Sequence, residues 1–391
     1  MAKRSSLIGF VGLCLAVTVA QAGQAGRQRL RDLGIATGVV APGPLNAITD
    51  VAGVRVGHTT LLEGDSVRTG VTAVLPHGEN IFQLKVPAAV YAANAFGKAA
   101  GFLQVRELGN IETPIVLTNT LCVGTVVQAV VDWTLARSGN EEVRSVNAVV
   151  GETNDGYLND IRTCAVTSEH VFAAIAGARA GSVEEGSVGA GTGTATLGWK
   201  GGIGTASRML PPSLGGYTVG ALVQSNFGGV LTIDGMRLGE RLGRYAYRDQ
   251  LERARGTAVA PMPEDDGSCM VVLATDAPLS PRDLERLAKR AVLGLARTGS
   301  FMHHGSGDFV IAFSTRNPVP YSAPAPTATV ELLGGDSVSP LFLATVEAVE
   351  EAVLNSLMKA TTVTGHAGHT LEALPLDEVR RMLEQRYEGP E

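Results

Sequence analysis

The sequence predicts a layered domain of mixed helices and strands, of the α/β or α+β class. Two observations indicate this. Short apolar runs rich in β-branched residues recur along the chain, each bounded by Gly, Pro, Asn or Asp. Segments with helix-start signals or helical periodicity lie between them. The composition agrees, since 45% of the 391 residues are hydrophobic and 48 are glycine, which suits a buried core with many tight turns.

The apolar runs are the expected strands. Several lack a clean alternation of apolar and polar residues, which is typical of strands covered on both faces. They span residues 72–75, 115–117, 148–150, 218–223, 270–275, 309–314 and 327–332.

Five segments are expected to be helical. In the run that begins at Ser280, a serine N-cap precedes Pro281 and an acid follows in the first turn, so a helix should extend to about residue 297. The other helices are expected at residues 123–136, 171–180, 339–359 and 376–386. In contrast, residues 247–267 are polar, charged and contain proline, and they predict an exposed tail that ends at Gly267.

The first 22 residues are typical of a secretory signal peptide. Lys3 and Arg4 precede a short apolar stretch at residues 7–20 and an Ala-Gln-Ala cleavage site. The alternative is a retained N-terminal anchor. Cleavage would remove these two cations and change the formal net charge from −6 to −8. We therefore expect a periplasmic or secreted protein with no stable membrane insertion after signal removal, and no nucleic-acid partner, since no basic stripe is present.

The cysteines give no sign of a disulfide framework or a zinc site. Cys14 leaves with the signal, and Cys122, Cys164 and Cys269 remain, an odd number without framework spacing. Free, buried cysteines are the simpler expectation.

The junction Gly267-Ser268 is a candidate self-cleavage site. A serine hydroxyl that attacks the carbonyl just before it produces an ester, whose hydrolysis splits the chain, and glycine leaves that approach open. The new α-amine, with an ordinary pKa of about 7.7–8.0, can then serve as general base for its own hydroxyl. The alternative is an ordinary junction between a loop and a strand. Cleavage here would give one domain built from two chains, residues 23–267 and 268–391, after removal of residues 1–22.

Two further segments follow or precede expected strands. Asn226, in "QSNFGG", could direct its amide into a cleft as an oxyanion donor, or be a turn residue. Ser306 and Asp308, in "HHGSGDF", would share a face of an extended segment and could orient Ser268, or belong to a glycine-rich turn. For the adjacent His303 and His304 we expect surface or substrate-lining roles.

The segment "VGETNDGYLND" at residues 150–160 contains Glu152 and Tyr157. A carboxylate here could hold a cationic substrate amine; the alternative is an Asx-rich turn. Residues 189–208 are glycine-rich, but their spacing does not match a dinucleotide site, so a hairpin that lines a cleft is expected. His366 and His369 have metal-compatible spacing without a third ligand nearby, which favours a loop.

Together these segments resemble one family, the self-processing aminopeptidases that include L-aminopeptidase/D-Ala-esterase/amidase and the β-peptidyl aminopeptidases. The resemblance covers nearly all of the chain after the signal, in the family's order. It rests on residues 45–61 and 68–78, on "ETPIVLTNTLCVG", "GETNDGYLND", "GWKGGIGTASR" and "VQSNFG", and on "DGSCMVVLATDAPL" and "GSGDFVIAFST".

The resemblance implies a role for each candidate. Ser268 is the nucleophile after cleavage, Asn226 the oxyanion donor and Ser306 the assisting hydroxyl, while Asp308 stands where some members carry the longer Glu. Glu152 receives the substrate's free amine, and Tyr157 lines the same pocket or supports the oxyanion. The implied fold is a four-layer αββα sandwich, like that of N-terminal nucleophile hydrolases but with different connectivity. A homo-oligomer, often a tetramer, is implied as well, without a metal or cofactor.

The expected function is an exported aminopeptidase or amidase that acts on short peptides, amides or esters with a free amine. A conventional serine hydrolase is disfavoured because no serine lies in a G-x-S-x-G frame. The remaining alternative is an unprocessed, non-enzymatic periplasmic binding protein on the same fold.

Overall fold

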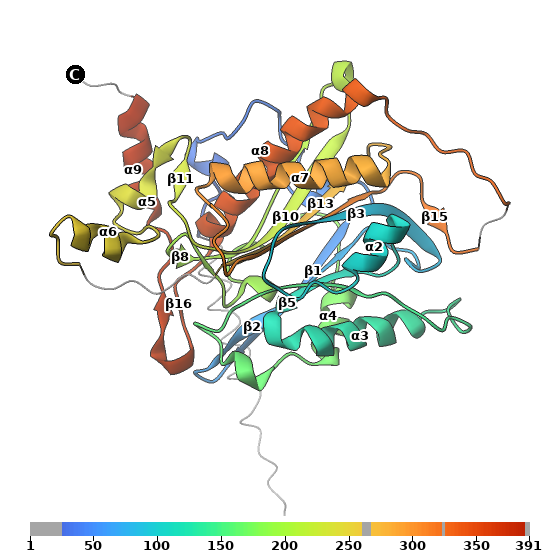
Figure 1. The fold of residues 1–391 in the computed structure, drawn as a ribbon, viewed down its shortest axis with the longest axis horizontal. Helices are drawn as coiled ribbons and strands as arrows, with labels where there is room; N and C mark the ends of the chain where they lie inside the picture. The colour runs from blue at the N-terminus through green and yellow to red at the C-terminus, as the bar shows by residue number, and fades with distance from the viewer. Residues whose placement is uncertain (1–25, 260–266, 323–324, 388–391) are drawn as a thin grey trace, which may run out of the picture.

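The computed structural model describes residues 26–259, 267–322 and 325–387, which form four layers (Figure 1). Two β-sheets face each other in the middle, and helices cover their outer faces. The predicted four-layer αββα sandwich is therefore confirmed. The expected signal segment lies outside the described residues. Among the described residues, no helix is long and apolar enough to cross a membrane.

The larger sheet has seven strands in the order β15-β3-β14-β13-β10-β9, and β4 pairs with β3 beside this path. All its neighbouring strands are antiparallel except β13 and β14, which run parallel. The strands are β3 (Leu84–Ala95), β4 (Asn110–Ile111), β9 (Gly202–Met209), β10 (Thr218–Asn226), β13 (Ser268–Thr275), β14 (Gly307–Ser314) and β15 (Val319–Pro320).

The smaller sheet has the order β1-β2-β5-β6. Its strands are β1 (Arg55–Glu63), β2 (Val67–Leu75), β5 (Ile115–Asn119) and β6 (Val149–Thr153). Helices α3 (Val123–Leu135) and α4 (Ser168–Ala176) cover its outer face, while α7 (Pro281–Arg297) and α8 (Ser339–Lys359) cover the outer face of the larger sheet.

Apolar side chains fill the three spaces between the four layers. Along β13, Met270 and Val272 belong to the cluster between the two sheets, whereas Cys269 and Val271 belong to the cluster under α7 and α8. Successive side chains of a strand point to opposite faces, so a strand with apolar neighbours on both faces carries an uninterrupted apolar run. This arrangement explains why the sequence lacked alternation here.

The five expected helices are present, with shifts at their ends. Helix α7 begins as predicted, because the Ser280 hydroxyl oxygen accepts a hydrogen bond from the Asp283 N–H at 3.2 Å, a cap worth about 1 kcal/mol. The fifth is α9 (Leu376–Tyr387). The remaining helices are α2 (Phe102–Leu108), α5 (Leu238–Arg241) and α6 (Arg248–Ala254), and three short strand pairs are β7–β8 (Ala195–Thr196, Trp199–Lys200), β11–β12 (Thr232–Ile233, Met236–Arg237) and β16–β17 (Val363–Thr364, Thr370–Leu371).

Two sequence predictions are corrected. Residues 327–332 form no strand. All six are exposed, so their β-branched side chains have neither a partner strand nor an apolar layer to pack against. The expected tail at residues 247–267 contains α6, which the Tyr245 hydroxyl supports by donating to Glu252 Oε1 at 2.7 Å. Residues 260–266 of that tail lie outside the described residues.

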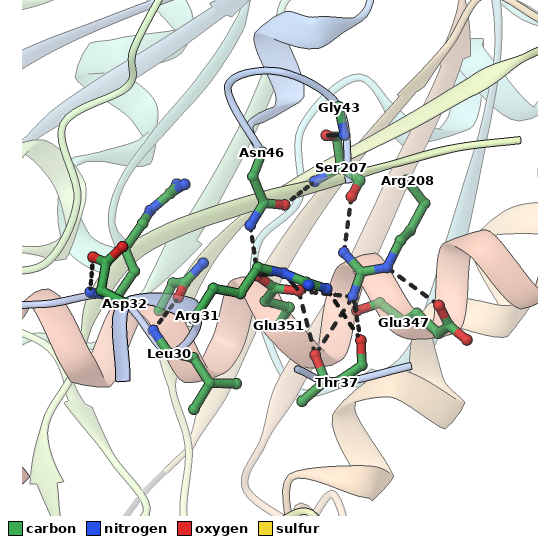
Figure 2. A network of polar contacts seen from close by, with 12 residues as sticks. Leu30, Arg31, Asp32, Thr37, Gly43, Asn46, Ser207, Arg208, Glu347 and Glu351 are labelled. Carbon is green, nitrogen blue, oxygen red and sulfur yellow. Dashed lines mark hydrogen bonds and ion pairs between the residues drawn. The ribbon is translucent and has the colours of Figure 1, made fainter. Parts of the chain in front are cut away.

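A buried ionic network ties the N-terminal segment and β9 to α8 (Figure 2). Arg208, which is fully buried, contacts Glu347 at 3.2 Å and Glu351 at 2.7 Å. Arg31 contacts the other oxygen of Glu351 at 2.8 Å, and Asn46 donates to that same oxygen at 2.5 Å. Burial opposes ionisation of Glu351, but its bond to Arg31 and the charge of Arg208 hold its pKa below the usual value.

Candidate active site

Ser268 and Asn226 are register partners in the larger sheet. Ser268 is the first residue of β13, and Asn226 is the last residue of the antiparallel β10. Side chains directly opposite in an antiparallel pair have Cβ atoms roughly 4.5–5.5 Å apart. Alternate side chains of a strand point to the same face. Ser268 therefore points to the same side as Met270 on β13, and Asn226 to the same side as Leu222 on β10, which is the space between the two sheets. The two predicted catalytic groups therefore lie on one face of the sheet.

The amide of Asn226 is oriented by the glycine-rich segment that precedes β9. Its Oδ1 accepts a hydrogen bond from the Ala195 N–H at 2.9 Å, which leaves the Nδ2 hydrogens as donors. The same segment is anchored by Lys200, whose buried Nζ donates to the carbonyls of Gly191 and Gly201 at 2.9 and 2.8 Å. Burial lowers the pKa of Lys200 to about 7. The segment at residues 189–208 thus orients the Asn226 amide, a role different from the nucleotide site that its glycines superficially suggest.

The backbone of Gly267, the residue before Ser268, is held on both sides of its Cα. The Gly267 N–H donates to Nε2 of His303 at 3.1 Å, and the Gly267 carbonyl accepts from the Gly307 N–H at 3.3 Å. Gly307 is also the register partner of Ser268 on the parallel strand β14. A backbone donor therefore already faces the carbonyl that a cleavage reaction would attack.

Ser306 and Asp308 flank Gly307, and both are buried. Neither the Ser306 hydroxyl nor the Asp308 carboxylate has a hydrogen-bond partner of standard geometry among the described residues. Burial raises the pKa of Asp308 to about 6, and the nearby Ser306 hydroxyl and the charge of His303 partly offset this rise. A buried carboxyl with a pKa so near neutrality is suited to proton transfer.

The register places Asp308 opposite Cys269, one position beyond the Ser268–Gly307 pair. By strand alternation its carboxyl belongs to the helix-covered face, whereas Ser268 belongs to the face between the sheets. Burial, with the charge of Asp308 as a second cause, raises the pKa of the Cys269 thiol. Asp308 makes no direct hydrogen bond to Ser268 in this structure.

Glu152 and Ser306 both accept hydrogen bonds from the turn that follows β3. The Phe96 N–H donates to the Ser306 carbonyl at 3.3 Å, and two residues later the Lys98 N–H donates to Glu152 Oε1 at 2.9 Å. A Cβ at Gly97 would lie 2.9 Å from Glu152 Oε1, so only glycine fits there without displacing the carboxylate. Glu152 itself is buried at the end of β6. The turn after β3 thus connects the predicted amine-binding acid to the backbone of Ser306, the residue predicted to assist the nucleophile.

Tyr157 contacts a histidine of a neighbouring hairpin. Its ring stacks on His369 with centroids 4.4 Å apart and planes 8° apart, and its carbonyl is 2.9 Å from Nδ1 of that histidine. His369 belongs to the β16–β17 hairpin, as the predicted loop requires. Among the described residues, Tyr157 makes no hydrogen bond to Ser268, Asn226 or Glu152. The same part of the chain contains no cluster of His, Cys, Asp and Glu able to hold a metal ion.

The structure adds residues that sequence reasoning missed. His303 was expected to have a surface or substrate-lining role, yet its ring bonds to Gly267. Asn94 on β3 was not considered, although its Nδ2 donates to the carbonyls of both His303 and Ser306. The turn-forming run "HHGSG" was the available signal for His303; nothing local distinguishes Asn94, because its role depends on strand pairing.

The expectation of three free cysteines is wrong. Cys122 and Cys164 form a disulfide with Cα atoms 5.4 Å apart, and Cys269 remains free and buried. The bond joins the start of α3 to the loop before α4, two segments that pack on the same outer face. Their separation of 42 residues hid the pairing in the sequence.

The four-layer αββα sandwich is a fold like that of the N-terminal-nucleophile hydrolases. The chain belongs to peptidase family S58, whose model matches residues 46–371. It is 42% identical to a β-peptidyl aminopeptidase, BapA of Sphingosinicella microcystinivorans, over 96% of this chain and 97% of that one. These findings identify the chain as a peptide-bond hydrolase of the aminopeptidase type, and they decide against a non-enzymatic binding protein.

Solved structures agree with this assignment. The β-aminopeptidase of a Burkholderia species superposes with a TM-score of 0.83 at 42% identity, covering 93% of this chain and 100% of that one. The L-aminopeptidase D-Ala-esterase/amidase of Ochrobactrum anthropi, described as a variant of the Ntn hydrolase fold, gives a TM-score of 0.82 at 38% identity, with 92% and 98% covered.

Proposed function

We propose that this aminopeptidase matures by cutting itself between Gly267 and Ser268 and then works through an acyl-enzyme on Ser268. The observation that supports this most is the set of contacts around the Gly267–Ser268 peptide group. Its carbonyl already has a donor in Gly307 N–H, and Ser268 faces Asn226 across the sheet.

In the proposed cleavage, Ser268 Oγ bonds to the Gly267 carbonyl carbon and the Gly267–Ser268 C–N bond breaks. The hydroxyl proton ends on the released α-amine of Ser268, and water then hydrolyses the ester to give the Gly267 carboxylate. The products are residues 23–267 and 268–391, if residues 1–22 are removed as a signal. Both chains supply strands to the larger sheet, so cleavage does not require separation.

In turnover, the Ser268 α-amine accepts the proton of Oγ, which attacks the substrate carbonyl. The Nδ2 group of Asn226 donates to the developing oxyanion, Ser306 assists the nucleophile, and Asp308 holds Ser306. Glu152 receives the free amine of the substrate, which fixes the enzyme on the first residue. Tyr157 would line the pocket of the substrate amine or support the oxyanion.

The proposed substrates are short peptides, amides and esters with a free N-terminal amine. The names of the similar proteins extend the proposal to β-amino-acid residues at that position. Export to the periplasm or medium and assembly into a homo-oligomer complete the proposal, since the N-terminal pattern and the family resemblance support them.

Intact-mass spectrometry of the purified protein tests cleavage directly. Two chains, the smaller beginning at Ser268, are expected, together with hydrolysis of α- and β-aminoacyl amides. Ser268→Ala should remain one chain without activity. A Ser268→Ala protein that is still cut at the same bond, or that is active, would remove the basis of the proposal.

A further inference from the structure

The side chain of His303 contacts the residue on the acyl side of the proposed cleavage bond. Its Nε2 accepts the Gly267 N–H at 3.1 Å, and a Cβ added to Gly267 would lie 3.2 Å from the same nitrogen. Gly267 is buried here, although the residues just before it lie outside the described part of the chain. The imidazole therefore reaches the last residue of the larger chain before cleavage.

The backbone holds His303 in this place. Met302 has φ 52°, a left-handed conformation that non-glycine residues rarely adopt, and its N–H reaches Ser300 Oγ at 3.4 Å. The carbonyl of His303 accepts from the Ser306 N–H at 2.9 Å and from Asn94 Nδ2 at 3.0 Å. One short turn thus fixes both the imidazole that holds Gly267 and the predicted assisting residue Ser306.

We infer that His303 is a positioning residue for self-cleavage, an inference that rests on the proposed maturation. Two hydrogen bonds hold Gly267 on either side of its Cα: the imidazole accepts the N–H of the peptide group before Gly267, and the Gly307 N–H donates to the carbonyl of the proposed scissile peptide group. Fixing both ends holds the carbonyl carbon next to Ser268 Oγ and removes rotational freedom from the attack. The imidazole neither forms nor breaks a bond in the step.

This role ends with the reaction. Once the ester is hydrolysed, Gly267 carries a carboxylate and no longer has a covalent link to Ser268. The hydrogen bond to His303 then contributes nothing to holding the nucleophile, whose own register with Asn226 and Gly307 is set by the sheet. His303 should therefore influence the rate of maturation much more than the turnover of the matured enzyme.

The experiment follows maturation of the full chain during a chase after cell-free synthesis, using four proteins. They are the wild type, His303→Ala, His303→Gln, whose Oε1 can accept the same N–H, and the control His304→Ala, which changes an exposed neighbouring histidine. His303→Ala is expected to lengthen the half-life of the uncut chain about tenfold, the effect of losing one hydrogen bond in the transition state. His303→Gln should recover most of the rate, and His304→Ala should match the wild type.

The matured fractions are then compared in turnover of an aminoacyl amide, where kcat of His303→Ala should stay within about threefold of the wild type, well below the loss seen in maturation. Equal maturation rates for wild type and His303→Ala would overturn the inference. If His303→Ala does not fold, His303→Gln provides the test. A His303→Gln protein that melts like the wild type but remains as uncut as Ser268→Ala would also overturn the inference. A wild-type chain that is never cut would refute the proposed maturation itself, a separate outcome.

Discussion

Asn226 and Ser268 are directly opposed at the point where β10 ends and β13 begins. The pair places a side-chain amide beside the proposed nucleophile without any loop between them, and the Ala195 N–H fixes which end of the amide is free to donate. Strand pairing, a property of the whole sheet, thereby determines the local chemistry of the site.

Asn226→Ala should lower kcat by about 10²–10³, because it removes one oxyanion donor. It should also lower the melting temperature, because the Ala195 N–H loses its acceptor. Self-cleavage should be much less affected, since the Gly267 carbonyl accepts from the Gly307 N–H. Steady-state kinetics on the matured variant, beside its intact mass, measure both effects. Unchanged kcat would show that the amide has no part in stabilising the oxyanion.

Asp308 should give the activity a pH step. Burial raises its pKa from 3.8 to about 6, so kcat/KM should rise as pH increases through about 6 and the carboxylate forms. A second rise should follow near the α-amine pKa of about 7.7–8.0. Asp308→Asn should lose only the lower step; persistence of that step would assign it to another group.

The same shift affects stability in the opposite direction. Because the folded pKa exceeds the unfolded one, the protonated carboxyl is favoured by folding. Its stabilisation is complete below about pH 4 and is lost as pH rises through about 6. Denaturant unfolding at several pH values should therefore show a smaller pH-dependent loss over this interval in Asp308→Asn than in the wild type.

Glu152→Gln should impair binding of the substrate amine. Losing a charged hydrogen bond worth about 1.5–3 kcal/mol predicts roughly a 10- to 150-fold loss in kcat/KM for substrates with a free amine. An N-acetylated substrate, which carries no cation, is the control: wild type and variant should treat it alike. Equal losses on both substrates would indicate a structural role for the carboxylate.

Local apolar runs and helix caps predicted the strands β2, β5, β6, β10, β13 and β14 and five helices, but they missed β1, β3 and β9. Ser280 and Pro281 marked a helix start correctly, for example. The four-layer arrangement was implied by the family resemblance. The sequence also supplied Gly267, Ser268 and Asn226 as candidates, since each adjoins a strand end. The failures depend on long-range contacts: the Cys122–Cys164 bond spans 42 residues, and the partner of His303 is 36 residues away.

Helix α8 illustrates the same limit. The sequence predicts the helix but not the surroundings of its acids, and Glu347 and Glu351 are buried beneath the N-terminal segment. Glu347 accepts the N–H groups of Val39 and Val40 at 2.9 and 3.0 Å. Gly38, with φ +80°, allows that turn to pass so close that a Cβ would collide with the carboxylate. Only the fold shows what these charges pair with.

Glu351→Gln should destabilise the protein strongly, because it leaves Arg208 and Arg31 facing a neutral group in a buried site. Breaking a buried pair by removing one partner typically costs about 3–5 kcal/mol. The proposed cut would place both arginines on the larger chain and the glutamate on the smaller one, so the variant's matured chains should also separate at lower denaturant concentration. Unfolding curves followed together with size-exclusion chromatography measure the two effects.

Glu331→Gln is the matched control. Glu331 pairs with Arg316 at 2.9 Å, but both side chains are more than half exposed, at 57% and 59%. A solvent-exposed pair contributes about 0–1 kcal/mol, so this substitution should shift the unfolding midpoint only slightly. Similar small shifts for both variants would mean that water or a rearranged side chain compensates for the lost charge of Glu351, and that apolar contacts alone hold the two chains together.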